Sequence, residues 1–163
     1  MASRLDELYR TDFYAWTKDQ AAALRRLAEL RPNAEVDFEH VIEEVEGLGI
    51  TDYRTVASQL RRLCAHALKL EFSPSADPRL GWLRTVDDAR EKIADTISAA
   101  IRNDIEREWP KLYARARKLA ARELRRYGEP EAAAALPETC PYTLDQLLDE
   151  DWYPSNRHGL VDP

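Results

Sequence analysis

Apolar residues recur every three or four positions along most of the chain, with charged residues between them. This spacing puts the apolar side chains on one face of an α-helix. No stretch alternates between apolar and polar residues for long enough to predict a β-strand. The sequence therefore predicts an all-α fold, a bundle of four to five main helices with a short C-terminal helix docked on it.

Capping residues, glycines and prolines mark the expected ends of these helices. Thr11 is expected to cap the first helix, Gly47 and Gly49 to end the second, and Thr51 to open the third. Pro110 should bend the fifth helix or lie in its irregular first turn. The main helices are expected at residues 11–30, 37–47, 51–72, 79–101 and, from Asn103 or Asp104, to Tyr127, with Gly128 as the stop.

Each expected helix has a face that we predict to be buried. In the first helix this face contains Phe13, Trp16, Leu24 and Leu27. In the short second helix, the residues expected in the core are Phe38, Val41, Ile42 and Val45. A packed core of this kind would hold the bundle together through burial of apolar surface.

The segment CPYTLDQLLDEDWYP at residues 140–154 predicts a compact docking element. Thr143 and Gln146 have the spacing of a capping box, so a helix should begin at Leu144. Such a short helix is marginally stable alone, and its leucine-rich face should therefore pack on the bundle.

Length and composition favour one folded domain. The chain has 163 residues, of which 44% are apolar and 33% charged, so we predict a single domain over residues 1–154 and a disordered tail over residues 155–163. The start of the chain carries charges where a signal peptide needs an apolar run, and no apolar run reaches 18 residues. These features predict a cytoplasmic protein without a membrane segment.

The spacing of the cysteines and the absence of phosphate-binding motifs limit the kinds of chemical site that the sequence supports. Cys64 and Cys140 have no CxxC spacing, which favours two free thiols in a reducing compartment. The glycine-rich phosphate loops and the GxSxG nucleophile motif are absent from the sequence. We therefore expect no cofactor.

Three segments in this order resemble a known family: DFYAWT at 12–17, DFEHVIEEVEGLG at 37–49 and CPYTLDQLLDEDWYP at 140–154. The chain resembles the bacterial, especially cyanobacterial and proteobacterial, helical proteins of domain-of-unknown-function family 29. Leu70 stands where members often have Trp. The resemblance implies an all-α bacterial protein of the cytoplasm, and it carries no established activity.

A polar set on the expected second, third and fourth helices is the first candidate site. If Glu44, His66 and Arg90 converge, they could do general acid–base chemistry, so these three are the catalytic candidates. His40, Glu44 and His66 are the corresponding metal-ligand candidates. The structural interpretation is preferred: Arg90, on an apolar face, would form a buried ion pair with Glu44 or Glu43.

A basic stripe on the expected fifth helix is the second candidate. Its members are Lys111, Arg115, Lys118, Arg122 and Arg125. Such a stripe would attract an anion or a nucleic-acid backbone. The alternative is a solvated face or a partner for the acidic second helix, since residues 35–46 contain six acids and no Lys or Arg. No aromatic residue interleaves the stripe, which argues against base stacking.

The leading prediction is a protein-interaction or regulatory module without catalysis, whose partner is another protein or a second copy. The alternatives are a small metal- or acid/base-dependent enzyme built on the Glu/His/Arg set, and nucleic-acid binding through residues 111–126, which is disfavoured. No membrane partner is expected. Whether the protein is an enzyme is left open by the sequence.

Overall fold

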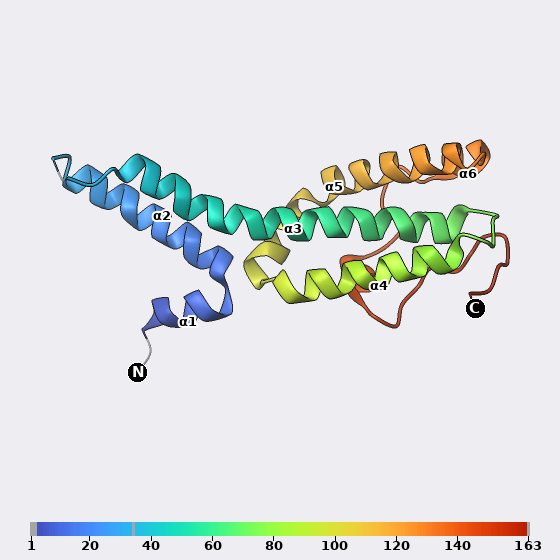
Figure 1. Cartoon of the computed structure of the whole chain (residues 1–163), viewed down its shortest axis with the longest axis horizontal. Helices are drawn as coiled ribbons and strands as arrows, with labels where there is room; N and C mark the ends of the chain where they lie inside the picture. The colour runs from blue at the N-terminus through green and yellow to red at the C-terminus, as the bar shows by residue number, and fades with distance from the viewer. Residues whose placement is uncertain (1–2, 34, 163) are drawn as a thin grey trace. The chain divides into compact units, whose positions relative to one another are not determined.

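The computed structural model describes residues 3–33 and 35–162, and these residues form helices and no strand (Figure 1). The all-α prediction is therefore confirmed. The helices are α1 (Arg4–Thr11), α2 (Phe13–Leu30), α3 (Phe38–Phe72), α4 (Arg79–Thr96), α5 (Ala99–Arg126), α6 (Pro130–Ala135) and α7 (Leu144–Leu148). None of the described helices combines the length and the apolarity that crossing a bilayer requires.

The chain groups into two compact units. Unit 1 consists of Met1–Val56 and Thr96–Asp104, and unit 2 of Ala57–Asp95 and Ile105–Pro163. The long helices α3 and α5 contribute residues to both units. The single domain predicted over residues 1–154 stays a prediction.

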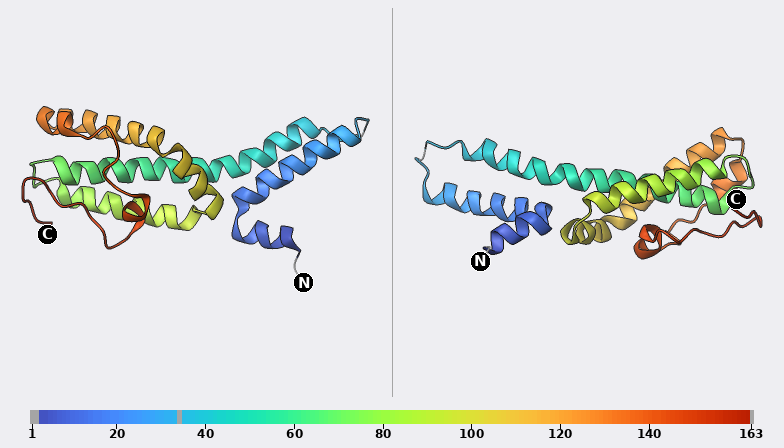
Figure 2. Two further views of the ribbon diagram at one scale, coloured as in Figure 1. Left: turned by 180° about the vertical axis from the view of Figure 1, so that it is seen from behind. Right: turned by 60° about the horizontal axis from the view of Figure 1, so that its bottom comes forward.

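In unit 1, α2 and the first half of α3 run side by side as an antiparallel hairpin (Figures 1 and 2). Asp12, not the predicted Thr11, caps α2: one carboxylate oxygen accepts a hydrogen bond from the Ala15 backbone N–H at 2.9 Å. Its other oxygen accepts from the Ala100 backbone N–H at 2.8 Å, in the first turn of α5. Thr11 instead ends α1, with its hydroxyl donating to the Glu7 carbonyl. One buried carboxylate thus satisfies two helix starts.

The helix break predicted at Gly47–Thr51 is wrong, because α3 is continuous from Phe38 to Phe72. Gly47 and Gly49 do not adopt a positive φ, which a glycine helix stop normally requires. The Thr51 hydroxyl donates to the Gly47 carbonyl at 2.9 Å instead of capping a new helix. Gly49 serves close packing: a Cβ there would lie 2.1 Å from Thr17 Oγ1 on α2.

In unit 2, the second half of α3 packs with α4, α5 and the C-terminal segment. Fully buried side chains include Leu63, Leu68, Leu70, Val86, Ile93, Leu124 and Leu147. Buried Lys69 forms an ion pair with Glu123 of α5 at 2.5 Å and lies over the Trp82 ring. The lysine charge is thereby matched within the core.

The boundary between α4 and α5 differs from the prediction. The fourth helix ends at Thr96, and α5 begins at Ala99, ahead of the predicted start at Asn103 or Asp104. Ser98 caps the start of α5, because its side-chain oxygen accepts a hydrogen bond from the Ile101 backbone N–H at 3.3 Å.

Farther along, Pro110 lies inside α5 and not in its first turn, and the helix continues to Arg126. Gly128 has φ +78°, as its predicted role as the helix stop requires. The short helix α6 that follows was not predicted, since its alanine run has no periodic apolar face.

The predicted C-terminal helix is confirmed. The Thr143 side chain accepts from the Gln146 backbone N–H, and the Gln146 side chain accepts from the Thr143 backbone N–H, forming the predicted capping box at the start of α7. Leu147 is completely buried, which docks α7 on unit 2.

Beyond α7, the structure differs from the disordered tail predicted over residues 155–163. The Asn156 side-chain amide donates to the carbonyls of Leu70 and Ser73 at 2.8 and 2.9 Å. Arg157 pairs with Glu71 at 2.9 Å. Polar contacts, which periodicity does not reveal, attach residues 156–162 to unit 2, and Pro163 lies outside the described residues.

Candidate interaction surface

The distal part of the unit 1 hairpin, residues 22–48, contains no buried residue among those that the structure describes. We call this segment the distal hairpin. Two packed helices bury only the narrow face along which they touch, and their other faces stay exposed to water. In the distal hairpin, α2 and α3 bury none of the described side chains between them. Arg25 and Glu46 form an ion pair between the two helices at 2.7 Å.

Large apolar side chains of the distal hairpin are exposed to solvent. The exposed fractions are 79% for Leu30, 55% for Leu48, 49% for Val36, 41% for Leu27 and 39% for Val41. Leu27 and Val41 were predicted in the core, and this prediction is wrong, because both side chains are exposed in the part of the chain that the structure describes. Several large apolar side chains exposed on one hairpin, from α2, the connection and α3, favour an interaction site.

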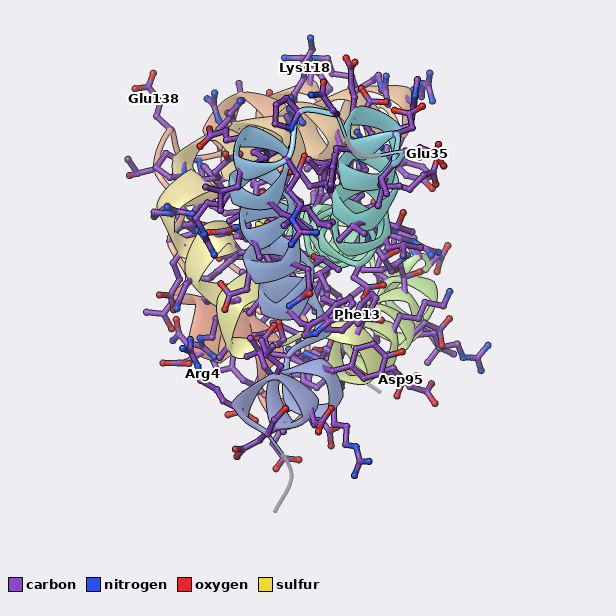
Figure 3. The ribbon with its side chains drawn as sticks, turned by 90° about the vertical axis from the view of Figure 1, so that its left-hand side faces the viewer. Arg4, Phe13, Glu35, Asp95, Lys118 and Glu138 are labelled. Atoms are coloured by element: carbon purple, nitrogen blue, oxygen red, sulfur yellow. The ribbon has the colours of Figure 1, made fainter. Side chains whose placement is uncertain are left out.

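Acidic side chains flank the exposed apolar residues of α3, Val41 and Leu48. Glu39, Glu43 and Glu44 are exposed, and within the described chain none of them forms an ion pair. In Figure 3 the Glu35 side chain extends away from the ribbon. Val41, Glu44 and Leu48 are spaced three and four residues apart and share one helix face. This face of α3 is therefore apolar and negatively charged.

His40, a predicted metal-ligand candidate, pairs with Asp37 at 2.5 Å, with both side chains exposed. The Asp37 carboxylate accepts a hydrogen bond from the ring and raises the pKa of His40. Across the described residues, no group of three or more His, Cys, Asp or Glu side chains is placed to hold a metal ion.

The structure does not bring the three catalytic candidates together. Glu44 lies in unit 1, whereas His66 and Arg90 lie in unit 2. Because α3 is one continuous helix, about six turns separate Glu44 from His66. The hypothesis of a Glu/His/Arg active site placed Glu44 and His66 on two separate helices whose flanks could converge, whereas the structure places both on one continuous helix.

The predicted ion pair of Arg90 with Glu44 or Glu43 is also wrong. The buried Arg90 guanidinium donates to the carbonyls of Leu147 at 2.9 Å and Trp152 at 2.6 Å, and more weakly to that of Glu150 at 3.4 Å. It also lies 4.9 Å from the centre of the Tyr153 ring. Arg90 therefore binds the main chain around the end of α7, and its role is structural.

His66 is half-buried, and its Nδ1 lies 2.8 Å from the Arg62 carbonyl. Burial, followed by the nearby Lys69 charge, lowers the pKa of His66 from 6.5 to about 4. Between these two values the unfolded chain binds a proton that the folded protein does not bind. The free energy of unfolding should therefore fall as the pH drops through this window, by up to about 1.4 kcal/mol per pH unit.

This expectation is checked by urea unfolding of wild type and His66→Gln at about pH 7 and about pH 5. The variant should lose less stability on acidification. His40→Gln is the matched control, because the raised pKa of His40 stabilises the folded protein at low pH and gives the opposite sign. Equal pH dependence in wild type and His66→Gln would contradict the assignment.

The five residues of the predicted basic stripe, Lys111, Arg115, Lys118, Arg122 and Arg125, are all exposed on α5. Figure 3 shows the Lys118 side chain extending away from the ribbon. In the part of the chain that the structure describes, none of the five pairs with an acid. Tyr113 is buried, whereas Tyr127, two positions after Arg125, is 59% exposed and packs edge-on against Trp82.

Unit 2 also has a pocket of about 550 Å³, lined among others by Phe72, Ala132, Ala135, Arg157 and Glu129. Arg157 belongs to the segment predicted as a disordered tail. The lining mixes apolar residues with charges of both signs, so it does not define one class of ligand.

With this geometry in place, comparison with known proteins identifies the family. The sequence profile of the family described as "Domain of unknown function DUF29" matches residues 8–153. The chain belongs to this family. The match includes the Asp12 cap, the distal hairpin and α7, and it confirms the resemblance that the sequence motifs suggested.

A solved structure shares the fold. It is the crystal structure of an α-helical protein of unknown function from Rhodospirillum rubrum, with 28% sequence identity and a TM-score of 0.76. The alignment covers 88% of this chain and 90% of that chain. No curated protein matches this DUF29 chain.

Proposed function

We propose that this DUF29 protein is a non-catalytic interaction module that docks an amphipathic helix of another protein on its distal hairpin. One observation carries the proposal: no described residue of the distal hairpin is buried, although the segment exposes Leu27, Leu30, Val36, Val41 and Leu48. A third helix laid on the hairpin would bury such side chains, with a gain of about 25 cal/mol per Å² of apolar surface removed from water, before entropy losses.

The negative charge of this surface indicates which kind of helix the partner presents. The acids Glu39, Glu43 and Glu44 lie on α3 close in sequence to Val41 and Leu48, and they form no ion pair within the described chain. A helix with an apolar stripe and a basic flank would complement them, whereas an acidic helix would be repelled. The partner is therefore a protein that presents a basic amphipathic helix. The proposed setting is the bacterial cytoplasm, which the two free thiols support.

The test uses a fluorescein-labelled helical peptide of leucine and lysine, titrated with the full-length protein and followed by anisotropy. Substituting both Val41 and Leu48 with Ser should weaken binding at least about tenfold, since the apolar contact is lost. Leu80→Ser is the control, because Leu80 is similarly exposed at 47% but lies in unit 2.

Three results would contradict the proposed function, two from this titration and one from light scattering. A leucine–glutamate peptide that binds as tightly as the leucine–lysine peptide would exclude a basic partner. Equal binding by wild type and the double variant would place the site elsewhere. A dimer in light scattering that the double variant abolishes would make a second copy the occupant and overturn the proposed partner.

A further inference from the structure

The basic stripe of α5 is a straight row of positive charge on one face of the helix. Its members are Lys111, Arg115, Lys118, Arg122 and Arg125, and all of them are exposed. They follow one another at steps of four, three, four and three residues, which a helix with 3.6 residues per turn keeps on one face. At 1.5 Å per residue, the row is about 21 Å long.

No acid neutralises the basic stripe within the described chain. Glu123 is the only acidic residue in the segment 111–126, and its carboxylate pairs with the buried Lys69 ammonium. The acidic residues 35–46, the other partner considered from the sequence, form ion pairs only with residues of unit 1 where the structure describes them. Like charges three and four residues apart on a helix repel one another. The stripe therefore has positive charge that an external polyanion would neutralise.

The side chains between Lys111 and Arg125 indicate the kind of polyanion. No large apolar side chain is exposed in this described segment, whereas helices that bind an anionic membrane surface also insert apolar residues. Tyr113, the only aromatic residue of the segment, is buried, and exposed Tyr127 lies beyond the end of α5. Proteins that bind single strands stack bases on exposed aromatic rings. Charge without apolar or aromatic contacts fits the phosphate backbone of a duplex.

We propose that α5 binds the phosphate backbone of a nucleic-acid duplex through the basic stripe, without reading the base sequence. Neighbouring charges of the stripe lie about 4.5–6 Å apart along the helix axis. A duplex has one phosphate charge per about 1.7 Å of its own axis, so a phosphate is within reach of each side chain. The stripe belongs to unit 2 and the distal hairpin to unit 1, so this interaction is independent of the proposed peptide docking.

The experiment titrates a fluorescein-labelled DNA duplex of about 30 base pairs with the full-length protein and follows anisotropy at several salt concentrations. Contacts from all five side chains predict that log Kd rises with log salt concentration with a slope of about 4.5. Binding should therefore weaken about 500-fold between about 50 and 200 mM salt. A duplex of unrelated sequence should have the same Kd, because phosphate contacts do not read the bases. An RNA duplex of the same length distinguishes the two sources of the backbone, and binding of either duplex by the stripe supports the proposal.

Paired substitutions separate the basic stripe from the net charge of the protein. Lys118→Gln combined with Arg122→Gln should raise Kd at about 50 mM salt at least tenfold and lower the salt slope by about 2. Arg84→Gln combined with Lys92→Gln is the matched control, because it removes the same charge from exposed positions of α4 and should change neither value. Lys118→Arg combined with Arg122→Lys keeps the charge and should bind like wild type.

Several results would overturn the proposal. Wild type that binds no duplex at about 50 mM salt, or binds one with no salt dependence, would exclude backbone binding. Equal Kd values for the stripe variant and the α4 control would place the contact elsewhere. A single-stranded oligonucleotide that binds more tightly than the duplex would indicate base stacking. Phosphatidylglycerol vesicles that bind when the duplex does not would assign the stripe to a membrane surface. The wild-type salt slope needs no variant and tests the proposal even if a variant fails to fold.

Discussion

Arg90→Ala should lower the free energy of unfolding by about 3–5 kcal/mol, the largest loss that we expect from a single substitution in this protein. The guanidinium donates to the carbonyls of Leu147 and Trp152 at 2.9 and 2.6 Å, and it is only 5% exposed. Alanine would leave these carbonyls without their charged donor and would open a cavity beneath α7.

Arg90→Lys should also destabilise the protein, because one ammonium cannot reproduce the planar set of N–H donors. Arg84→Ala is the matched control: Arg84 lies in the same helix, α4, but is exposed. Its change should stay within about 0.5 kcal/mol. Urea unfolding measures all three variants, and an Arg90→Ala loss no larger than that of Arg84→Ala would remove Arg90 from its role in docking α7.

Gly49→Ala and Gly47→Ala should change stability in opposite directions. The new Cβ at Gly49 would lie 2.1 Å from Thr17 Oγ1 and 3.2 Å from Thr17 Cβ, while a Cβ at Gly47 would meet nothing within 4 Å. Thr17 is buried, and its hydroxyl donates to the Tyr14 carbonyl at 2.8 Å, so it cannot move aside without losing that bond. Overpacking should cost Gly49→Ala about 1–3 kcal/mol.

Gly47→Ala should stabilise the protein by about 0.5–1 kcal/mol, because alanine restricts the unfolded chain and favours helix. Thermal or urea unfolding of both variants provides the comparison. Stabilisation by both substitutions would mean that α2 and α3 do not approach closely at Gly49, and destabilisation by both would mean that Gly47 has a contact as well.

The parts of the fold that the sequence predicted depend on local signals. The apolar period of three to four residues predicted the helices, and the Thr143–Gln146 capping box predicted where α7 begins. Gly128 was identified correctly as the stop after α5 because the chain adopts a positive φ there. Each of these signals acts within about one helical turn, and each was read from adjacent residues.

The wrong predictions concern positions whose local conformation depends on a contact with a residue far away in the sequence. Gly49 resembles a helix stop, but it is a contact point for Thr17 on α2, so α3 continues through it. Asp12 caps two helices, and its bond to the Ala100 backbone N–H could not be foreseen from its neighbours. The same continuity of α3 separates Glu44 from His66.

The candidate surface was predicted only in part. The charge asymmetry of residues 35–46 was visible in the sequence, and so was the apolar spacing of Leu27 and Val41. Spacing shows that these residues share a helix face, but it does not show whether another helix covers that face.

Amide hydrogen exchange of the full-length protein, with and without the leucine–lysine peptide, is the most direct test of docking on the distal hairpin. Without the peptide, amides of residues 22–48 should exchange faster than those of the buried part of α3, because no described side chain there is buried. With the peptide, we predict slower exchange in residues 22–48 and little change along α5. Slowing confined to residues 111–125, or no slowing in the distal hairpin at saturating peptide, would contradict the proposed function.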